Sequence, residues 1–264
     1  MNIYLILALL AAVATALLFW FAHQVGKKIH LILETEAVSI AFLQELQQSM
    51  QESVGAGSMH YFTEVNGSAI SPAPLLSPLG QVACVYYQMK VSRRYEESYY
   101  SRDKEGNRTH HTRSGSDTIS DESRFAPLEI EDASGRLTID PQGAELRPLT
   151  TFDRFEPARA GAVLNIGDYQ LTIPEQLKQG EQRTLGYHFH ETAIPLQQTL
   201  YVMGEVNDRD GTLVLERSAN KAHRFIISCE TEEALLAAAQ RQQQYLKIAA
   251  VVALLAAVIL PFFA

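Results

Sequence analysis

The two ends of the chain carry long runs of apolar residues. The first run covers residues 3–22 and contains no charged side chain. An α-helix rises about 1.5 Å per residue, so this run is long enough to cross the roughly 30 Å hydrocarbon core of a bilayer. The second run covers residues 248–264, near the lower length limit for a spanning helix. The pattern predicts one transmembrane helix at residues 1–22 and another at residues 248–264.

A cleaved signal peptide is the alternative interpretation of the first run. Signal peptides begin with a basic segment and have a shorter apolar stretch, of about 7–15 residues. No lysine or arginine precedes residue 3. We therefore expect residues 1–22 to be a membrane anchor.

Helical periodicity continues beyond both apolar runs. After the first run, apolar side chains recur at three- and four-residue steps, at Ile29, Leu33, Ala37, Ile40 and Leu43. Before the second run, Thr231 can cap a helix that has acidic residues in its first turn. The pattern predicts helical juxtamembrane stalks at residues 23–54 and 230–247. The first stalk either packs on its own domain or forms a coiled coil or partner surface.

Between the stalks, the alternation typical of β-strands replaces the helical pattern. Strands are expected at residues 81–91, 184–192 and 223–228, and hairpins at residues 128–140 and 199–216. We therefore predict an antiparallel β-rich domain over residues 55–229. The fold class is an α+β membrane protein in which two transmembrane helices, with helical juxtamembrane stalks, flank this domain.

Residues 97–123 differ from the rest of the β-rich region. They contain few aliphatic residues and many Ser, Asp, Arg and Gly. Such a segment cannot bury a core of its own. We expect a long, mobile, polar hairpin tip.

Charge and cysteine content narrow the functional classes. Every charged residue lies between the two apolar runs, which therefore enclose the whole net charge of −8. An acidic loop argues against binding of nucleic acid and against broad adhesion to anionic lipid. The two cysteines, Cys84 and Cys229, could form one disulfide, but their spacing does not decide this. Two cysteines cannot supply a cysteine-rich zinc module.

The candidate chemical groups are few and unspecific. His188 and His190 would share one face of a strand and could hold a metal, but a polar sheet face is the simpler interpretation. His110 and His111 lie in the polar tip, where solvated side chains are expected. Glu191 and Glu205 could both face a pocket; this too is unspecific in a chain with 30 acidic residues.

The sequence contains no Gly-x-Ser-x-Gly, no phosphate-binding glycine loop and no His-Glu-x-x-His. We therefore predict no catalytic residue, no cofactor-binding residue, no metal ligand and no cofactor.

Three longer motifs lie between the apolar runs: PLLSPLGQVACVYY at residues 74–87, FAPLEIEDASGRLTIDP at 125–141 and ETAIPLQQTLYVMGE at 191–205. Together with the flanking membrane helices, their order resembles the GIDE family, also called the beside-a-membrane (BAM) domain family. The resemblance extends over roughly residues 55–264. The chain is also similar to the membrane region of the mitochondrial ubiquitin ligases Mulan and MAPL, which are members of that family. The second motif is matched loosely, because one extra residue separates Phe125 from Leu128.

The resemblance gives Gly204 and Glu205 a structural interpretation. A glycine inside a strand indicates a bulge or a close backbone approach. We therefore expect the Gly-Glu pair to be a fold signature in which Glu205 accepts a structural hydrogen bond, in preference to a catalytic carboxylate.

The chain also departs from the eukaryotic ligases. Their RING module follows the second membrane helix and binds zinc through cysteine and histidine ligands, which the two cysteines here cannot supply. The resemblance is closer to RING-less prokaryotic members. It implies a bacterial envelope or membrane-stress system, with a LemA-type membrane protein or a second copy of the chain as partner.

Two arguments on membrane orientation disagree. Four basic residues flank the apolar runs on the loop side: Lys27, Lys28, Arg241 and Lys247. The positive-inside rule then places the loop domain in the cytoplasm. In the mitochondrial relatives the domain faces the intermembrane space, which corresponds to the periplasm. We expect a two-pass protein of the bacterial inner (cytoplasmic) membrane with a cytoplasmic loop domain, and keep the periplasm as the alternative.

These observations favour a membrane-anchored protein-interaction or scaffold module that has no catalysis of its own. E3 ubiquitin ligase-like activity is one alternative. A ligand- or lipid-sensing subunit at the membrane surface is the other.

Overall fold

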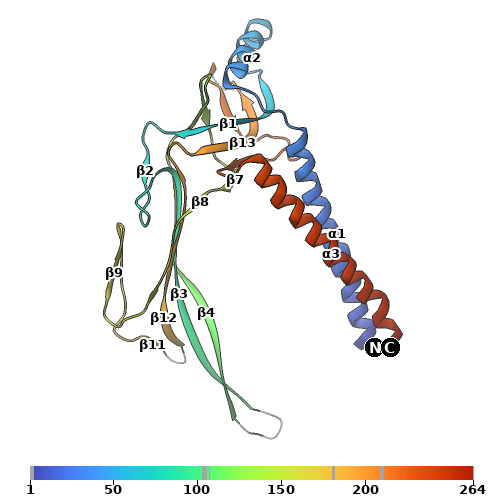
Figure 1. The fold of residues 1–264 in the computed structure, drawn as a ribbon, viewed down its shortest axis with the longest axis vertical. Coiled ribbons are helices and arrows are strands. Elements are labelled where there is room, and N and C mark those ends of the chain that lie inside the picture. Colours follow the sequence, from blue (N-terminus) through green and yellow to red (C-terminus); the bar gives the residue numbers. More distant parts are fainter. Residues whose placement is uncertain (1–2, 103–105, 107, 180–181, 209–210, 264) are drawn as a thin grey trace. The chain divides into compact units, whose positions relative to one another are not determined.

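The computed structural model describes residues 3–102, 106, 108–179, 182–208 and 211–263 (Figure 1). The chain divides into two compact units. The first consists of Met1–Asn66, Pro141–Leu146 and Leu200–Ala264. The second consists of Gly67–Asp140 and Arg147–Thr199. The β-rich region that the sequence predicts as one domain is thus shared between two units.

Two long helices of the first unit confirm the predicted membrane helices. They are α1 (Ile3–Glu34) and α3 (Glu232–Ile259), which continues into the 3-10 turn η2 (Leu260–Phe263). Both are long and apolar enough to cross a membrane, and most of their apolar side chains are exposed. These helices indicate a membrane protein.

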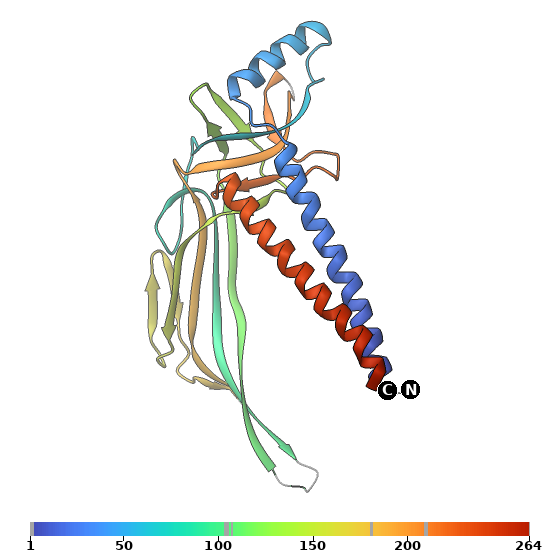
Figure 2. The same ribbon diagram turned by 45° about the vertical axis from the view of Figure 1, so that its right-hand side comes forward.

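Small residues line the contact between α1 and α3, which lie side by side in both views (Figures 1 and 2). The buried residues of α1 include Ala8, Thr15 and Ala22, which recur every seven positions on one side of the helix. In α3, Ala239 and Ala250 are buried. Small side chains let helix backbones approach closely, which is how helices associate within a membrane.

The predicted helical stalk at residues 23–54 is divided in the structure. Helix α1 ends at Glu34, and α2 (Ile40–Ser53) begins after an extended linker. Ser39 caps α2 by accepting a hydrogen bond from the N–H of Phe42, at 3.3 Å. Ile40 and Leu43 are fully buried in the first unit, so this segment packs on its own domain.

The strands of the first unit surround a small apolar core. They are β7 (Glu145–Arg147), β13 (Thr199–Asn207), β14 (Val214–Glu216), β15 (Ile226–Ser228) and the first part of β1 (His60–Ile70). The hydrogen-bonded order is β14-β13-β15-β7, and β1 also pairs with β13. Tyr201, Met203 and Ile226 pack against Ile32 of α1 and Leu235 of α3. The loop-side ends of both membrane helices are therefore part of this core.

A buried acidic residue, Glu64, joins these strands to the linker between α1 and α2. Glu64 on β1 is only 2% exposed and accepts a hydrogen bond from the Tyr201 hydroxyl at 2.6 Å. The backbone of Glu64 bonds to both sides of the linker: its carbonyl accepts from Val38 N–H at 3.0 Å, and its own N–H donates to the Glu36 carbonyl at 3.3 Å. Burial raises the pKa of Glu64, although the Tyr201 hydroxyl partly opposes this.

The second unit is built on a sheet of six strands. They are β2 (Leu75–Leu76), β3 (Ala83–Arg102), β4 (Arg108–Phe125), β8 (Leu149–Pro157), β11 (Lys178–Gln179) and β12 (Gln182–Pro195). The four longest strands run in the order β4-β3-β12-β8 with antiparallel pairing. Two hairpins complete the unit: β5 (Leu128–Glu131) with β6 (Arg136–Ile139), and β9 (Val163–Ile166) with β10 (Tyr169–Thr172).

One face of this sheet is covered. Met89 and Val91 of β3 and Phe189 of β12 are buried on it, and they pack with Leu164 and Leu171 of the β9–β10 hairpin. Successive strand side chains point to opposite faces, so the remaining residues of these strands form a second face.

The hairpins predicted from the sequence are confirmed. The turn between β5 and β6 is closed by Asp132, whose Oδ1 accepts hydrogen bonds from the N–H groups of Ser134 and Gly135 at 2.7 and 2.9 Å. Residues 97–102 and 108–123 pair as part of the long β3–β4 hairpin, whereas residues 103–105 and 107 of the predicted tip lie outside the described residues. The mobility of its tip remains a prediction.

Gly204 lies where β13 packs most closely on its neighbours. A Cβ at this position would be 2.7 Å from Leu215 Cδ2, and 2.9 Å from both the Glu216 carbonyl oxygen and the Phe225 ring. We therefore predict that Gly204→Ala lowers the free energy of unfolding by about 1–3 kcal/mol, the usual cost of overpacking. Thermal unfolding in detergent measures this. Thr199→Ala, at an exposed position of the same strand, is the control, and equal melting temperatures for the two variants would contradict the prediction.

A second prediction concerns the pH dependence of stability. The folded-state pKa of Glu64 lies above its ordinary value of 4.5. Its stabilising contribution is therefore fully present below that value and is lost as the pH rises through the raised pKa. Glu64→Gln keeps an acceptor for Tyr201 and removes the ionisation, so it should cancel this pH-dependent loss of stability. Melting temperatures measured from pH 4 to pH 8 test this, with the exposed Glu45→Gln as control. Parallel curves for wild type and Glu64→Gln would refute it.

Candidate functional site

The second face of the β4-β3-β12-β8 sheet carries polar and aromatic side chains. On β3 this face presents Lys90 and Arg94, and on β8 it presents Asp153 and Phe155. All four residues are exposed. The face thus contrasts with the covered side, where Met89, Val91 and Phe189 are buried.

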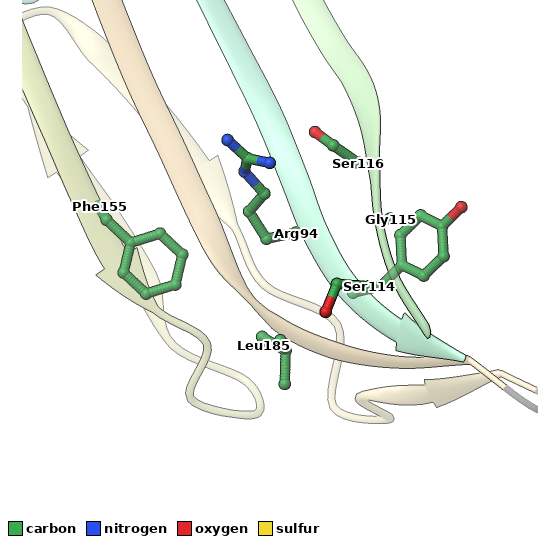
Figure 3. A pocket seen from close by; sticks show the side chains of 7 residues that line it. Arg94, Ser114, Gly115, Ser116, Phe155 and Leu185 are labelled. Carbon is green, nitrogen blue, oxygen red and sulfur yellow. The ribbon is translucent and has the colours of Figure 1, made fainter. Parts of the chain in front are cut away.

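An open pocket of about 490 Å³ lies at one end of this face (Figure 3). Its lining comes from four adjacent strands and consists of Arg94, Tyr95, Ser114, Gly115, Ser116, Phe155 and Leu185. In Figure 3 the side chains follow the strand order, with Phe155 at one side, Arg94 in the middle and the two serines at the other side.

A β-bulge and a glycine shape the apolar side of the pocket. Thr184 pairs with Tyr95 and Gly186 pairs with Arg94, so Leu185 between them is an extra residue that has no partner on β3. Gly186 leaves room for the ring of Phe155, because a Cβ there would be 2.4 Å from Phe155 Cζ. Leu185 and Phe155 remain 39% and 48% exposed.

The polar side of the pocket contains the cation Arg94, for which the described residues provide no counter-ion. The Arg94 side chain forms no ion pair or hydrogen bond with any residue that the structure describes, and it is exposed. Its neighbour Arg93 differs, because Arg93 bonds to Asp117 at 2.6 Å. Ser116, which lies opposite Arg94 on β4, adds a hydroxyl group. The pocket therefore offers hydrogen-bond donors for an anion beside an apolar wall.

His188 and His190 do lie on one face, next to the pocket, as the sequence predicts. Asp153 lies between them. Its Oδ1 bonds to His188 Nε2 and its Oδ2 bonds to His190 Nδ1, both at 2.9 Å. These hydrogen bonds lower the pKa of Asp153. Sequence reasoning missed Asp153, because only the pairing of β8 with β12 brings it to the histidines.

Asp153, His188 and His190 form a hydrogen-bonded polar cluster on this face. Each carboxylate oxygen of Asp153 is already bonded to one imidazole. No group of three or more metal-ligating side chains is found in the described part of the chain.

Glu191 holds a loop in the second unit and does not line the pocket. It is fully buried, and it accepts hydrogen bonds from the N–H groups of Leu79 and Gly80 at 2.7 and 3.1 Å and from the Thr151 hydroxyl at 2.9 Å. Burial, together with the negative charge of Glu191, raises the pKa of the buried Cys84 thiol to about 11. The Glu191 carboxylate is thus committed to the fold.

Glu205 belongs to the first unit, so the structure does not place it in one unit with Glu191. It accepts a hydrogen bond from the Ser218 hydroxyl at 2.5 Å and bonds to His60 Nδ1 at 2.9 Å. Burial opposes ionisation, but these hydrogen bonds outweigh it and lower the pKa of Glu205. The structural hydrogen bond that the sequence predicts for Glu205 is therefore present.

Ser218 also contacts the Nδ1 atom of His223 at 3.3 Å. In a catalytic triad the histidine stands between the serine and the acid. Here the serine donates directly to the carboxylate, so the group does not have that arrangement.

The remaining candidates are distributed over the chain. In the β3–β4 hairpin His111 stacks on its cross-strand neighbour Tyr99, and His110 meets its neighbour Tyr100 edge-on. Cys84 lies in the second unit, and the structure contains no disulfide between it and Cys229.

The fold and the site together define a membrane protein with a β-rich region, one open sheet face and a small mixed pocket. Comparison with protein families matches residues 96–260 to the GIDE family, which is described as E3 ubiquitin ligase. The matched residues make up more than half of the chain, and the chain therefore belongs to the GIDE family. The comparisons with curated proteins and with solved structures found no match.

The raised pKa of Cys84 makes a prediction about thiol reactivity. Only the thiolate attacks alkylating reagents, and at pH 8 a thiol with a pKa of about 11 is ionised in roughly one molecule in a thousand. Cys84 is also fully buried, whereas Cys229 is partly exposed. We expect iodoacetamide to modify native Cys84 at least about 100-fold more slowly than Cys229. Peptide mass mapping over time measures this, and unfolded protein, in which both sites should react, is the control. Similar rates in the native protein would exclude the buried, un-ionised state of Cys84.

Proposed function

We propose that this GIDE-family chain is a membrane-anchored protein-interaction module that holds a partner protein close to the bilayer and has no catalysis of its own. The observation that carries the proposal is the open sheet face of the second unit. There, the exposed side chains of Phe155 and Leu185 lie beside the Arg94 guanidinium, which has no counter-ion among the described residues. Exposed apolar groups with a polar rim are typical of protein-binding sites.

The hydrogen bonding of three acidic residues, two of them buried, supports a scaffold over an enzyme. Glu64, Glu191 and Glu205 each accept hydrogen bonds that join separate segments of their own unit. A general acid or base needs a side chain that faces a bound substrate. These carboxylates are instead used to hold strands and loops together.

We further propose that the protein resides in the bacterial inner membrane as part of an envelope or membrane-stress system. The basic residues that flank the membrane helices on the loop side support a cytoplasmic position of the loop domain; they are Lys27, Lys28, Arg241 and Lys247. The periplasm is the alternative. The partner in this proposal is a LemA-type membrane protein or a second copy of the chain.

The family description favours a second candidate, a role in ubiquitin transfer. The printed sequence has two cysteines, which are too few for a RING-type zinc module. A ligase function of these residues would therefore need a partner that supplies the zinc module. Incubation of the purified protein with ubiquitin, an activating enzyme and a panel of conjugating enzymes tests this candidate. Formation of ubiquitin conjugates that depends on the chain would support the second candidate against the first.

Extraction in mild detergent tests the scaffold proposal. We expect the tagged full-length protein to migrate as a defined particle that contains further copies or a second membrane protein, since an interaction module stays bound to its partner. Native mass analysis of the particle identifies its components, and extraction in a harsh detergent is the control. A monomer that carries no protein would overturn the scaffold role, and a stoichiometric bound lipid on such a monomer would support a lipid-sensing subunit instead.

A further inference from the structure

We propose that the Arg94 pocket recognises an extended acidic segment of a partner protein, in which an acidic side chain is followed two positions later by an apolar one. This inference rests on the interaction function proposed above and specifies the chemistry of its binding site. The acidic side chain would bond to Arg94, and the apolar side chain would contact Leu185 and Phe155.

The charge of the pocket indicates that the bound segment carries an acidic side chain. Arg94 is an exposed guanidinium without a counter-ion among the described residues, whereas Arg93 and Arg113 bond to Asp117 and Glu97. A guanidinium can bind a carboxylate through two parallel hydrogen bonds, and a carboxylate is the anion that an unmodified protein segment carries. Ser114 and Ser116 on β4 add small hydroxyl-bearing side chains on that side of the pocket.

The strand order determines the spacing between the acidic and the apolar side chain of the bound segment. Arg94 pairs with Gly186, next to Leu185 on the neighbouring strand, and Phe155 is on the strand beyond. Neighbouring strands are about 4.8 Å apart, so the apolar wall begins roughly 5 Å from the Arg94 strand and ends roughly 10 Å from it. In an extended chain, side chains two positions apart lie on the same face and are separated by about 7 Å. An acidic and an apolar residue with this spacing therefore fit the pocket.

The size of the positive charge favours a protein segment over an anionic membrane surface. Recognition of acidic lipid headgroups uses clusters of about four to eight basic residues. The pocket lining contains a single cation, Arg94, and it lies between hydroxyl and apolar groups. On the β4 side the pocket is lined by the small residues Ser114, Gly115 and Ser116, and the Tyr95 ring lies against Gly115.

A peptide-binding experiment tests the proposal on the purified full-length protein in detergent. The probe is a dye-labelled threonine-rich peptide, acetylated and amidated at its ends, with one glutamate and a leucine two positions later. Because the ends carry no charge, the glutamate is its only carboxylate. The measurement is fluorescence anisotropy at protein concentrations up to about 1 mM, which detects weak binding.

Arg94→Gln and replacement of the peptide glutamate by glutamine should each weaken binding about tenfold, because each removes one partner of a charged hydrogen bond. Combining the two changes should weaken it little further, since both remove the same interaction. Leu185→Ser should weaken binding several-fold through loss of apolar contact. The matched controls are Lys90→Gln, which removes an exposed cation of the same strand, and Leu149→Ser, which alters a similarly exposed leucine of the same sheet. Neither control should change the affinity.

Several outcomes would overturn the inference. They are absence of saturable binding, equal affinity for the glutamate and glutamine peptides, fully additive losses, or equal effects of the Arg94 and Lys90 substitutions. Arg94-dependent binding to phosphatidylglycerol vesicles, with no binding of the peptide, would assign the pocket to lipid instead. The scaffold proposal is judged separately by the detergent-extracted particle. A particle that persists while the peptide fails to bind would refute this inference alone.

Discussion

The buried hydrogen bond between Tyr201 and Glu64 is the interaction on which the first unit depends. It connects two strands whose bonded residues are 137 positions apart in the chain. The backbone of Glu64 at the same time holds the linker that follows α1. Tyr201 also packs against Ile32 of α1 and Leu235 of α3. A buried carboxyl group without a partner is costly, so β1, β13 and the loop-side ends of both membrane helices must adopt their positions together.

Acidic side chains also hold loops in place elsewhere in both units. Glu191 gathers the N–H groups of Leu79 and Gly80, and the buried Asp208 accepts from the N–H groups of Gly57 and Met59 at 2.8 and 2.9 Å. A short acidic side chain can satisfy two backbone donors that no strand partner reaches. The acidic residues of the sequence motifs therefore have structural roles. For this reason an acidic residue in such a motif is weak evidence for catalysis in this chain.

The two faces of the long sheet in the second unit differ in exposure. The β9–β10 hairpin packs on one face of the long sheet, and the other face remains exposed. Within that face, a bulge at Leu185 and a side-chain-free position at Gly186 create an apolar surface next to Arg94. Helices α1 and α3 belong to the same chain and are long and apolar enough to cross a membrane. In the interaction function proposed above, a sheet tethered in this way meets its partner near a bilayer, where a modest affinity is sufficient because tethering raises the local concentration.

Short stretches of the sequence were enough to predict the elements that depend on local signals. Two apolar runs predicted α1 and α3, a capping threonine predicted the start of α3, where Thr231 accepts from Ala234 N–H at 3.3 Å, and alternation around Asp132 predicted the β5–β6 hairpin. Tertiary structure alone decided where distant segments meet. The linker at residues 35–39 interrupts the helical pattern because Glu64 pairs with it. Asp153 reaches His188 and His190 only through the register of β8 on β12, and the pocket needs four strands. Periodicity reports which face of an element is apolar, but strand register depends on partners far along the chain, and no short stretch of sequence contains that information.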